Sequence, residues 1–252
     1  MLSLTLHKRI VNDAYAKHIA IRSTPFATNI ILKTIFLILG LTILTSCNLQ
    51  PKKEGEILKE RVLENIQTLR NAGFFEIYES MSDLEVYNTI YAHRKKRYSE
   101  IFEKQYDPGM DLDAIQLAEC DRTKLLFIDL EADVAMDNNV YIEVIKAFGI
   151  LSNKKFEPTD IKEQWTSETG PIEVSFKSND SLLKFKPEYQ DDWLHESVFK
   201  ICQEELERKN IRITDCSSDD GYGYGQAIAI MRLSEKEQKI LENKLNWKFT
   251  SE

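Results

Sequence analysis

The chain has 252 residues, of which 42% are hydrophobic and 29% are charged, and its formal net charge at pH 7 is −8. This length suffices for one substantial hydrophobic core or two small ones. The acidic excess disfavours nucleic acid and anionic lipid surfaces as partners and favours cationic ones.

A short apolar run near the N-terminus predicts a secretory signal. Residues 35–44 (IFLILGLTIL) follow Lys33, and the run has about half of the ~20 apolar residues that a membrane-spanning helix needs. A signal peptide typically has a basic flank, a short apolar core and small residues before the cleavage site. Directly at its end, Leu44-Thr45-Ser46-Cys47 resembles the lipobox of bacterial lipoprotein signal peptides. The alternative is an ordinary signal peptide or short membrane anchor with an incidental cysteine.

The lipobox resemblance implies cleavage between Ser46 and Cys47, with a diacylglycerol on the Cys47 sulfur as the link to membrane lipid. The signal peptide would then be residues 1–46, with 1–28 as an over-extended start, followed by a flexible tether over 47–55. Asn48 stands where an Asp often marks inner-membrane retention in Gram-negative cells. We therefore expect a lipid-anchored protein of the cell envelope, facing the periplasm or the exterior, with the outer membrane favoured.

Cleavage changes both the charge and the cysteine count. It removes five basic residues and one acidic residue from totals of 33 and 41, so 28 and 40 remain and the net charge becomes −12. The run His93–Arg97 is the main basic exception. Besides Cys47, the cysteines are Cys120, Cys202 and Cys216, and only the last two form a plausible disulfide, with buried free thiols as the alternative. No zinc-type spacing occurs, and no metal or cofactor is expected.

The first part of the mature chain, residues 56–105, is predicted to be helical. Leu58, Val62, Ile66 and Leu69 recur at spacings of three and four, and Gly73 suits the end of that helix. Ser82 or Asp83 is expected to cap a second helix, with the basic run on the side away from its apolar face. That face is predicted at Leu84, Tyr87, Tyr91, Tyr98, Ile101 and Phe102. Asp111 or Asp113 should cap one short helical turn before Cys120.

An alternating segment follows over residues 124–136 (KLLFIDLEADVAM) and predicts a half-buried strand. Its core face would carry Leu126, Ile128, Leu130, Ala132 and Val134. Asn138-Asn139 fits a tight hairpin turn, and residues 140–148 suit either a return strand or a short helix. Residues 156–165 are expected to connect onward with a short strand.

A boundary is predicted at Thr169-Gly170-Pro171. The elements expected beyond it are a hairpin over 172–185, a helix over 193–209 capped by Asp191 or Asp192, strands at 211–215 and 226–232, and a last helix behind the capping box Ser234–Glu237. Trp165, Trp193 and Trp247 are expected to anchor the core. The fold class is α+β, with N-terminal helices followed by antiparallel β-hairpins packed with helices, in two small subdomains over 56–168 and 169–252.

Several segments in fixed order resemble an uncharacterised family of acidic bacterial α+β proteins. They are 127–134 (FIDLEADV), 139–143 (NVYIE), 156–161 (FEPTDI), 170–172 (GPI) and 225–227 (GQA), and the resemblance covers roughly residues 74–249. The resemblance implies a fold and assigns no activity and no residue roles. Some small acidic proteins of this kind are immunity or accessory partners of secreted toxins, an analogy that suggests a cationic protein partner.

Asp129, Glu131 and Asp133 are the first candidate binding residues, because an alternating strand would place all three carboxylates on one face. Clustered carboxylates raise one another's pKa and can coordinate Ca²⁺ or Mg²⁺, which would suit a metal-assisted hydrolase. A solvated strand face produces the same pattern. An acidic stripe beside Phe127 would also suit docking of a basic protein.

Tyr222 and Tyr224 are the second candidate, within the glycine-rich segment 219–225 (DDGYGYG). Tyrosine offers contact area at low entropic cost, so a recognition loop is one interpretation and a flexible strand connection is the other. Neither His93 nor His195 accompanies a nucleophile motif, so no catalytic residue is predicted. We expect a membrane-anchored, non-enzymatic protein-binding domain, with the metal-assisted hydrolase as the alternative.

Overall fold

The computed structural model describes residues 54–102, 105–217 and 223–250. Within these ranges the chain forms six α-helices, one short 3-10 helix and two three-stranded antiparallel sheets, which confirms the predicted α+β class. The strand orders are β1-β6-β5 and β2-β3-β4. In this part of the chain, no helix combines the length and apolarity needed to cross a membrane.

The helices are α2 (Glu54–Asn71), η1 (Glu76–Tyr78), α3 (Asp83–Ile101), α4 (Ala114–Ala118), α5 (Val140–Leu151), α6 (Ser197–Arg208) and α7 (Glu235–Leu245). The strands are β1 (Leu125–Asp129), β2 (Thr159–Trp165), β3 (Ile172–Ser178), β4 (Ser181–Phe185), β5 (Ile213–Cys216) and β6 (Ala227–Arg232).

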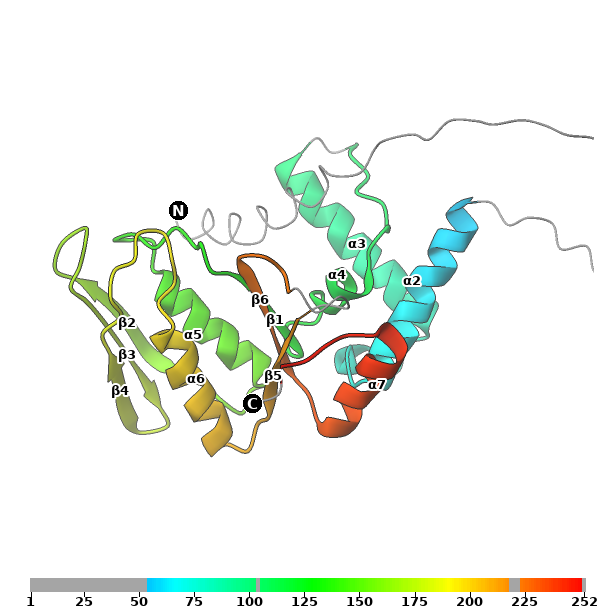
Figure 1. The fold of residues 1–252 in the computed structure, drawn as a ribbon. Helices are drawn as coiled ribbons and strands as arrows, with labels where there is room; N and C mark the ends of the chain where they lie inside the picture. The colour runs from blue at the N-terminus through cyan, green and yellow to red at the C-terminus, as the bar shows by residue number, and fades with distance from the viewer. Residues whose placement is uncertain (1–53, 103–104, 218–222, 251–252) are drawn as a thin grey trace, which may run out of the picture.

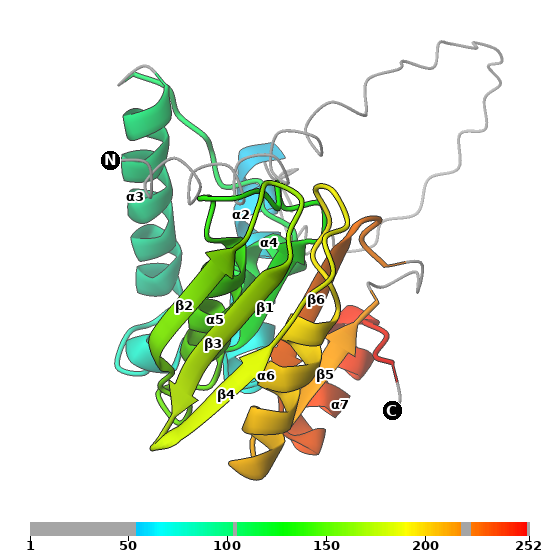
Figure 2. The ribbon, with the colours of Figure 1, turned by 90° about the vertical axis from the view of Figure 1, so that its left-hand side faces the viewer.

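The elements stack in layers around the β1-β6-β5 sheet. Figure 1 shows this sheet between α5 and α6 on one side and α2, α4 and α7 on the other. The β2-β3-β4 sheet covers the outer side of α5 and α6, and it faces the viewer in Figure 2.

The central sheet is buried on both faces, which differs from the half-buried strand expected for β1. Leu126 pairs with Ile230, and both belong to the core shared with α5, α6 and β3. Leu125 pairs with Met231, and both belong to the core shared with α2 and α7. Because successive strand residues point to opposite faces, β1 contributes to two cores at once.

The alternating segment leaves the sheet earlier than the sequence suggests. β1 ends at Asp129, and Asp133 has a left-handed φ of 52°. The ambiguous segment after Asn139 is the helix α5, not a return strand, and Asn139 precedes it with a φ of 56°. Asn and Asp tolerate this conformation better than other residues with a Cβ, so the turn was correctly located, and of the two elements left open after it the helix is the one that forms.

Local capping signals are confirmed at three helices. Complete capping boxes join Ser82 to Glu85 at α3, Asp113 to Gln116 at α4 and Ser234 to Glu237 at α7. The cap predicted for α6 is wrong, because this helix begins at Ser197 and Asp191 has a left-handed φ of 52° before it.

The predicted apolar face of α3 is partly confirmed, because Tyr87 and Tyr91 pack against the core shared with α2 and α7. The buried residues of this helix are Val86 and Ile90, whereas Leu84, Ile101 and Phe102 are exposed. α3 contacts α2, and its C-terminal half extends beyond that helix (Figure 1). Ile101 and Phe102 lie at this far end of the helix, whereas Leu84 is exposed in its first turn.

The strand pairing crosses the boundary predicted at 169–171. β1 pairs with β6 and β2 pairs with β3, so each sheet joins strands from the two expected subdomains. Cys202 lies on α6 and Cys216 on β5, and both are buried and outside any disulfide, while Cys120 is exposed.

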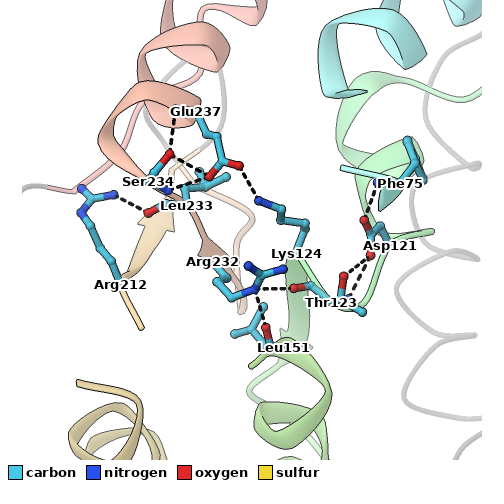
Figure 3. A network of polar contacts seen from close by, with 10 residues as sticks. All are labelled: Phe75, Asp121, Thr123, Lys124, Leu151, Arg212, Arg232, Leu233, Ser234 and Glu237. Atoms are coloured by element: carbon cyan, nitrogen blue, oxygen red, sulfur yellow. Dashed lines mark hydrogen bonds and ion pairs between the residues drawn. The ribbon is translucent and has the colours of Figure 1, made fainter. Parts of the chain in front are cut away.

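A polar network connects the central sheet to the helices around it (Figure 3). The Lys124 ammonium, at the start of β1, lies 2.7 Å from the Glu237 carboxylate of α7. The Arg232 Nε donates to the carbonyls of Thr123 and Leu151, both at 2.9 Å. Asp121 accepts from the backbone N–H of Phe75 at 2.6 Å, which fixes the turn that follows α2. These contacts satisfy groups that would otherwise be costly to bury.

Candidate functional site

The carboxylate of Asp129, the last residue of β1, accepts hydrogen bonds from nearby residues. The Gln226 side-chain amide donates to both carboxylate oxygens, at 2.9 and 3.1 Å. The backbone N–H of Glu131 donates to the same carboxylate at 3.1 Å, forming a turn that ends the strand. These bonds give Asp129 a structural role at the sheet edge.

The other two predicted carboxylates do not share a strand face with Asp129. Glu131 is exposed and pairs through its backbone with Trp193. Asp133 is half-buried and has a left-handed backbone, and its carbonyl accepts a hydrogen bond from the Asn138 side-chain amide at 2.7 Å. Over the described ranges, no group of three or more His, Cys, Asp or Glu side chains is placed to hold a metal ion.

Instead, the segment after β1 lies antiparallel to residues 190–194. The Leu194 N–H donates to the Leu130 carbonyl and the Ala132 N–H donates to the Asp192 carbonyl, each at 2.8 Å. Glu131 and Trp193 form the isolated bridge between these bonds. This pairing presents Trp193 at the surface, where 42% of it is exposed. The expectation that Trp193 anchors the core is therefore wrong, whereas Trp247 is buried as predicted.

Acidic residues flank this tryptophan in the two paired segments. Glu131, Asp191 and Asp192 are all exposed and come from the two paired segments. None of the three forms an ion pair with a described residue. We call Glu131, Asp191, Asp192 and Trp193 the Trp193 surface.

Tyr224, from the predicted recognition loop, packs inward. Its ring meets the edge of Phe127 at a centroid distance of 5.3 Å, and its hydroxyl lies 3.7 Å from the Cys216 sulfur. The Gly223 N–H donates to the Ser217 carbonyl at 2.7 Å and closes the base of the loop. Tyr222 lies outside the described residues, as do Ser46 and Cys47 of the lipobox.

His195 precedes α6 and takes part in its start. Its Nδ1 accepts from the Ser197 N–H at 3.2 Å and lies 2.9 Å from the Ser197 hydroxyl. A ring nitrogen that accepts a backbone N–H in the first turn acts as a helix cap, so this contact is accounted for by the local fold.

A pocket that the sequence did not reveal opens beside α3, with a volume of about 250 Å³. Its lining residues are Tyr78, Ile90, His93, Arg94, Arg97, Tyr98, Leu112, Glu119, Cys120 and Arg122. The basic run was expected on a solvated helix face, and three of its members line this pocket. His93, Arg94, Arg97 and Tyr98 are spaced so that they lie on one stripe of the helix. This spacing was the one feature of the sequence from which the pocket could have been predicted.

Comparison with known proteins identifies no relative of this chain. No protein-family model, no curated protein and no solved structure matches this chain.

Proposed function

We propose that the protein is a lipid-anchored, non-enzymatic binding domain of the bacterial cell envelope, and that the Trp193 surface binds a basic partner protein. The observation that carries this proposal is the exposure of Trp193 next to carboxylates that have no ion pair with a described residue.

The Trp193 surface has the two properties that protein recognition uses. A tryptophan offers a large apolar contact area and is frequent among residues that dominate binding energy. The backbone bridge to Glu131 holds this side chain's segment in place, so less conformational entropy is lost on binding. Exposed carboxylates around it would attract a basic partner and orient its approach.

The charge of the whole chain supports the same class of partner. The mature chain would carry 28 basic and 40 acidic residues, so a cationic protein would be attracted from a distance. Among cationic partners, we favour a secreted toxin or an accessory protein, by analogy with the acidic proteins that the chain resembles.

The anchor is tested by Cys47→Ser in cells labelled with a fatty-acid probe. We expect loss of label and of mature, envelope-bound protein, because this sulfur is the proposed acylation site. Cys120→Ser is the matched control, since Cys120 is an exposed free thiol that should carry no lipid. Unchanged labelling of Cys47→Ser would refute the anchor and would leave the binding surface as a separate question.

The binding surface is tested by affinity purification of the tagged full chain from detergent-solubilised envelopes. Trp193→Ala should reduce recovery of the specific partner about tenfold or more, the typical effect of losing a dominant interface residue. Ile77→Ala is the matched control, because Ile77 is 77% exposed and lies on η1 outside the Trp193 surface. Equal recovery with both variants would contradict the proposal.

A further inference from the structure

The pocket beside α3 gathers positive charge in an acidic protein. His93, Arg94 and Arg97 reach it from α3, and Arg122 reaches it from the segment before β1. The rest of the lining that matters for binding is apolar or aromatic, with Ile90, Leu112, Tyr78 and Tyr98. The pocket therefore pairs a cationic wall with an apolar one.

Two of these guanidinium groups form no direct contact with a carboxylate, although Glu143 attracts Arg122 through its charge. Neither Arg97 nor Arg122 has an ion pair or hydrogen bond with any described residue. Two arginines on other elements do have acidic partners: Arg61 pairs with Asp111 and Arg70 with Asp83. In a chain with excess carboxylates, two arginines that share a pocket without such partners leave its positive charge available to an anion.

Arg94 has a different role, because its guanidinium helps to build the pocket wall. It lies 4.9 Å from the centroid of the Tyr98 ring, and its Nη2 donates to the Pro108 carbonyl at 3.4 Å. This stacking stabilises the ring and fixes one aromatic side of the pocket.

Glu119 is the only carboxylic acid among the described residues that line the pocket. Burial raises the pKa of Glu119 to about 8, Asp113 adds to the rise, and Arg97 opposes it. At neutral pH this side chain is therefore mostly uncharged, so it does not repel an anion.

We propose that this pocket binds the phosphate group of a small organic ligand. Arg97 and Arg122 would hold the phosphate oxygens, and the apolar wall would contact the organic part. A volume of about 250 Å³ limits the ligand to a small molecule. Phosphate is favoured over carboxylate because two guanidinium groups without a direct ion pair match a dianion, and the planar guanidinium binds two phosphate oxygens at once.

The phosphate has two candidate sources, a soluble phosphate ester and the headgroup of an anionic lipid. Tyr98 also stacks on Phe102 and Tyr106, with centroid distances of 5.6 and 5.7 Å, and both of those rings are exposed. Exposed aromatic rings next to basic residues are common at membrane surfaces, so the lipid source needs its own arm in the test.

The test titrates phenyl phosphate and inorganic phosphate into the full lipidated chain in detergent micelles, by calorimetry. Arg97→Gln and Arg122→Gln should each weaken phenyl phosphate binding about tenfold, the loss expected for one charged hydrogen-bond donor. Lys96→Gln is the matched control, since Lys96 is exposed on the same helix, carries the same charge and does not line the pocket.

Selective loss with the two arginine variants, and not with Lys96→Gln, supports the proposal. No binding of either phosphate at millimolar concentration overturns it. Equal weakening by Lys96→Gln also overturns it, because the attraction would then come from general charge. Benzoate that binds as tightly as phenyl phosphate overturns the assignment to phosphate.

Repeating the titration in nanodiscs of phosphatidylcholine, with and without phosphatidylglycerol, distinguishes a lipid headgroup from a soluble phosphate ester. Weaker apparent binding of phenyl phosphate in the discs with phosphatidylglycerol supports a lipid headgroup in the pocket. Equal binding in both discs supports a soluble phosphate ester. Both results require the arginine-dependent binding above, and neither depends on a protein partner at the Trp193 surface.

Discussion

Lys124 and Glu237 form an ion pair that joins the start of β1 to the capping box of α7, with 2.7 Å between Nζ and Oε1. The Lys124 side chain is 2% exposed and that of Glu237 is 22% exposed. Burial raises the pKa of Glu237, but the hydrogen bonds from Lys124 and Ser234 outweigh it, so its net pKa is lowered. The carboxylate thus serves the cap and the buried ammonium together.

Glu237→Gln should lower the free energy of unfolding by about 3 kcal/mol, because it leaves the Lys124 ammonium buried without its counter-charge. Chemical denaturation measures the loss. Glu235→Gln is the matched control on the same helix turn, where an exposed carboxylate contributes within about 0.5 kcal/mol. Equal stability of the two variants would show that the ion pair does not stabilise the fold.

Gly73→Ala should destabilise the protein more than Gly109→Ala. Both glycines have a left-handed φ, at 77° and 63°. A Cβ at Gly73 would collide with Glu237 Oε1 and lie 2.8 Å from Lys124 Nζ, whereas at Gly109 it would meet nothing within 4 Å. Gly109→Ala should therefore cost only the backbone strain of about 1–2 kcal/mol. Similar unfolding midpoints for the two variants would count against this packing.

The loop before α4 should loosen only in strong acid. The pKa of Asp107 is lowered to about 2 by hydrogen bonds from the Tyr91 hydroxyl, the Gly109 N–H and Lys95. Because the folded-state pKa lies below the ordinary value of 3.8, these contacts stabilise the loop fully above pH 3.8 and are lost as the pH falls through about 2. The Gly109 amide resonance, which reports its 3.0 Å bond to Asp107, should titrate near pH 2. Titration near pH 4, or an unchanged titration in Asp107→Asn, would contradict this assignment.

The two tryptophans Trp193 and Trp247 should differ in their contribution to stability. Trp247 is 5% exposed in the core with α2 and α7, so Trp247→Ala should cost about 3–5 kcal/mol. Trp193→Ala should cost about 1 kcal/mol or less, since 42% of this residue is exposed and it belongs to neither core cluster of the described residues. A large loss for Trp193→Ala in thermal unfolding would mean that this residue is structural.

What the sequence predicted well depends on contacts within a few residues. The capping boxes at Ser82 and Ser234 are local motifs, so their helices were found with nearly correct starts. The hairpin of β3 and β4 was likewise visible in alternation around a turn at residues 179–180. In these cases the residues that determine the structure are neighbours in the chain.

What the sequence did not predict depends on distant partners. Asp129, Glu131 and Asp133 alternate as a strand would, but residues 190–194 pair with the segment after Asp129 and turn it out of the sheet. That same pairing exposes Trp193. The pocket arginines were missed because Arg122 joins Arg97 only through the packing of separate elements.

The most direct test of the account is site-specific photo-crosslinking in living cells, with a photoreactive amino acid at position 193 or, as the control, at position 77. We expect a discrete adduct with a basic protein from position 193, no such adduct from position 77, and loss of the adduct when Glu131, Asp191 and Asp192 are replaced by lysine. If position 193 gives no adduct beyond that of position 77, or if charge reversal leaves the adduct unchanged, the Trp193 surface is not a binding site for a basic protein.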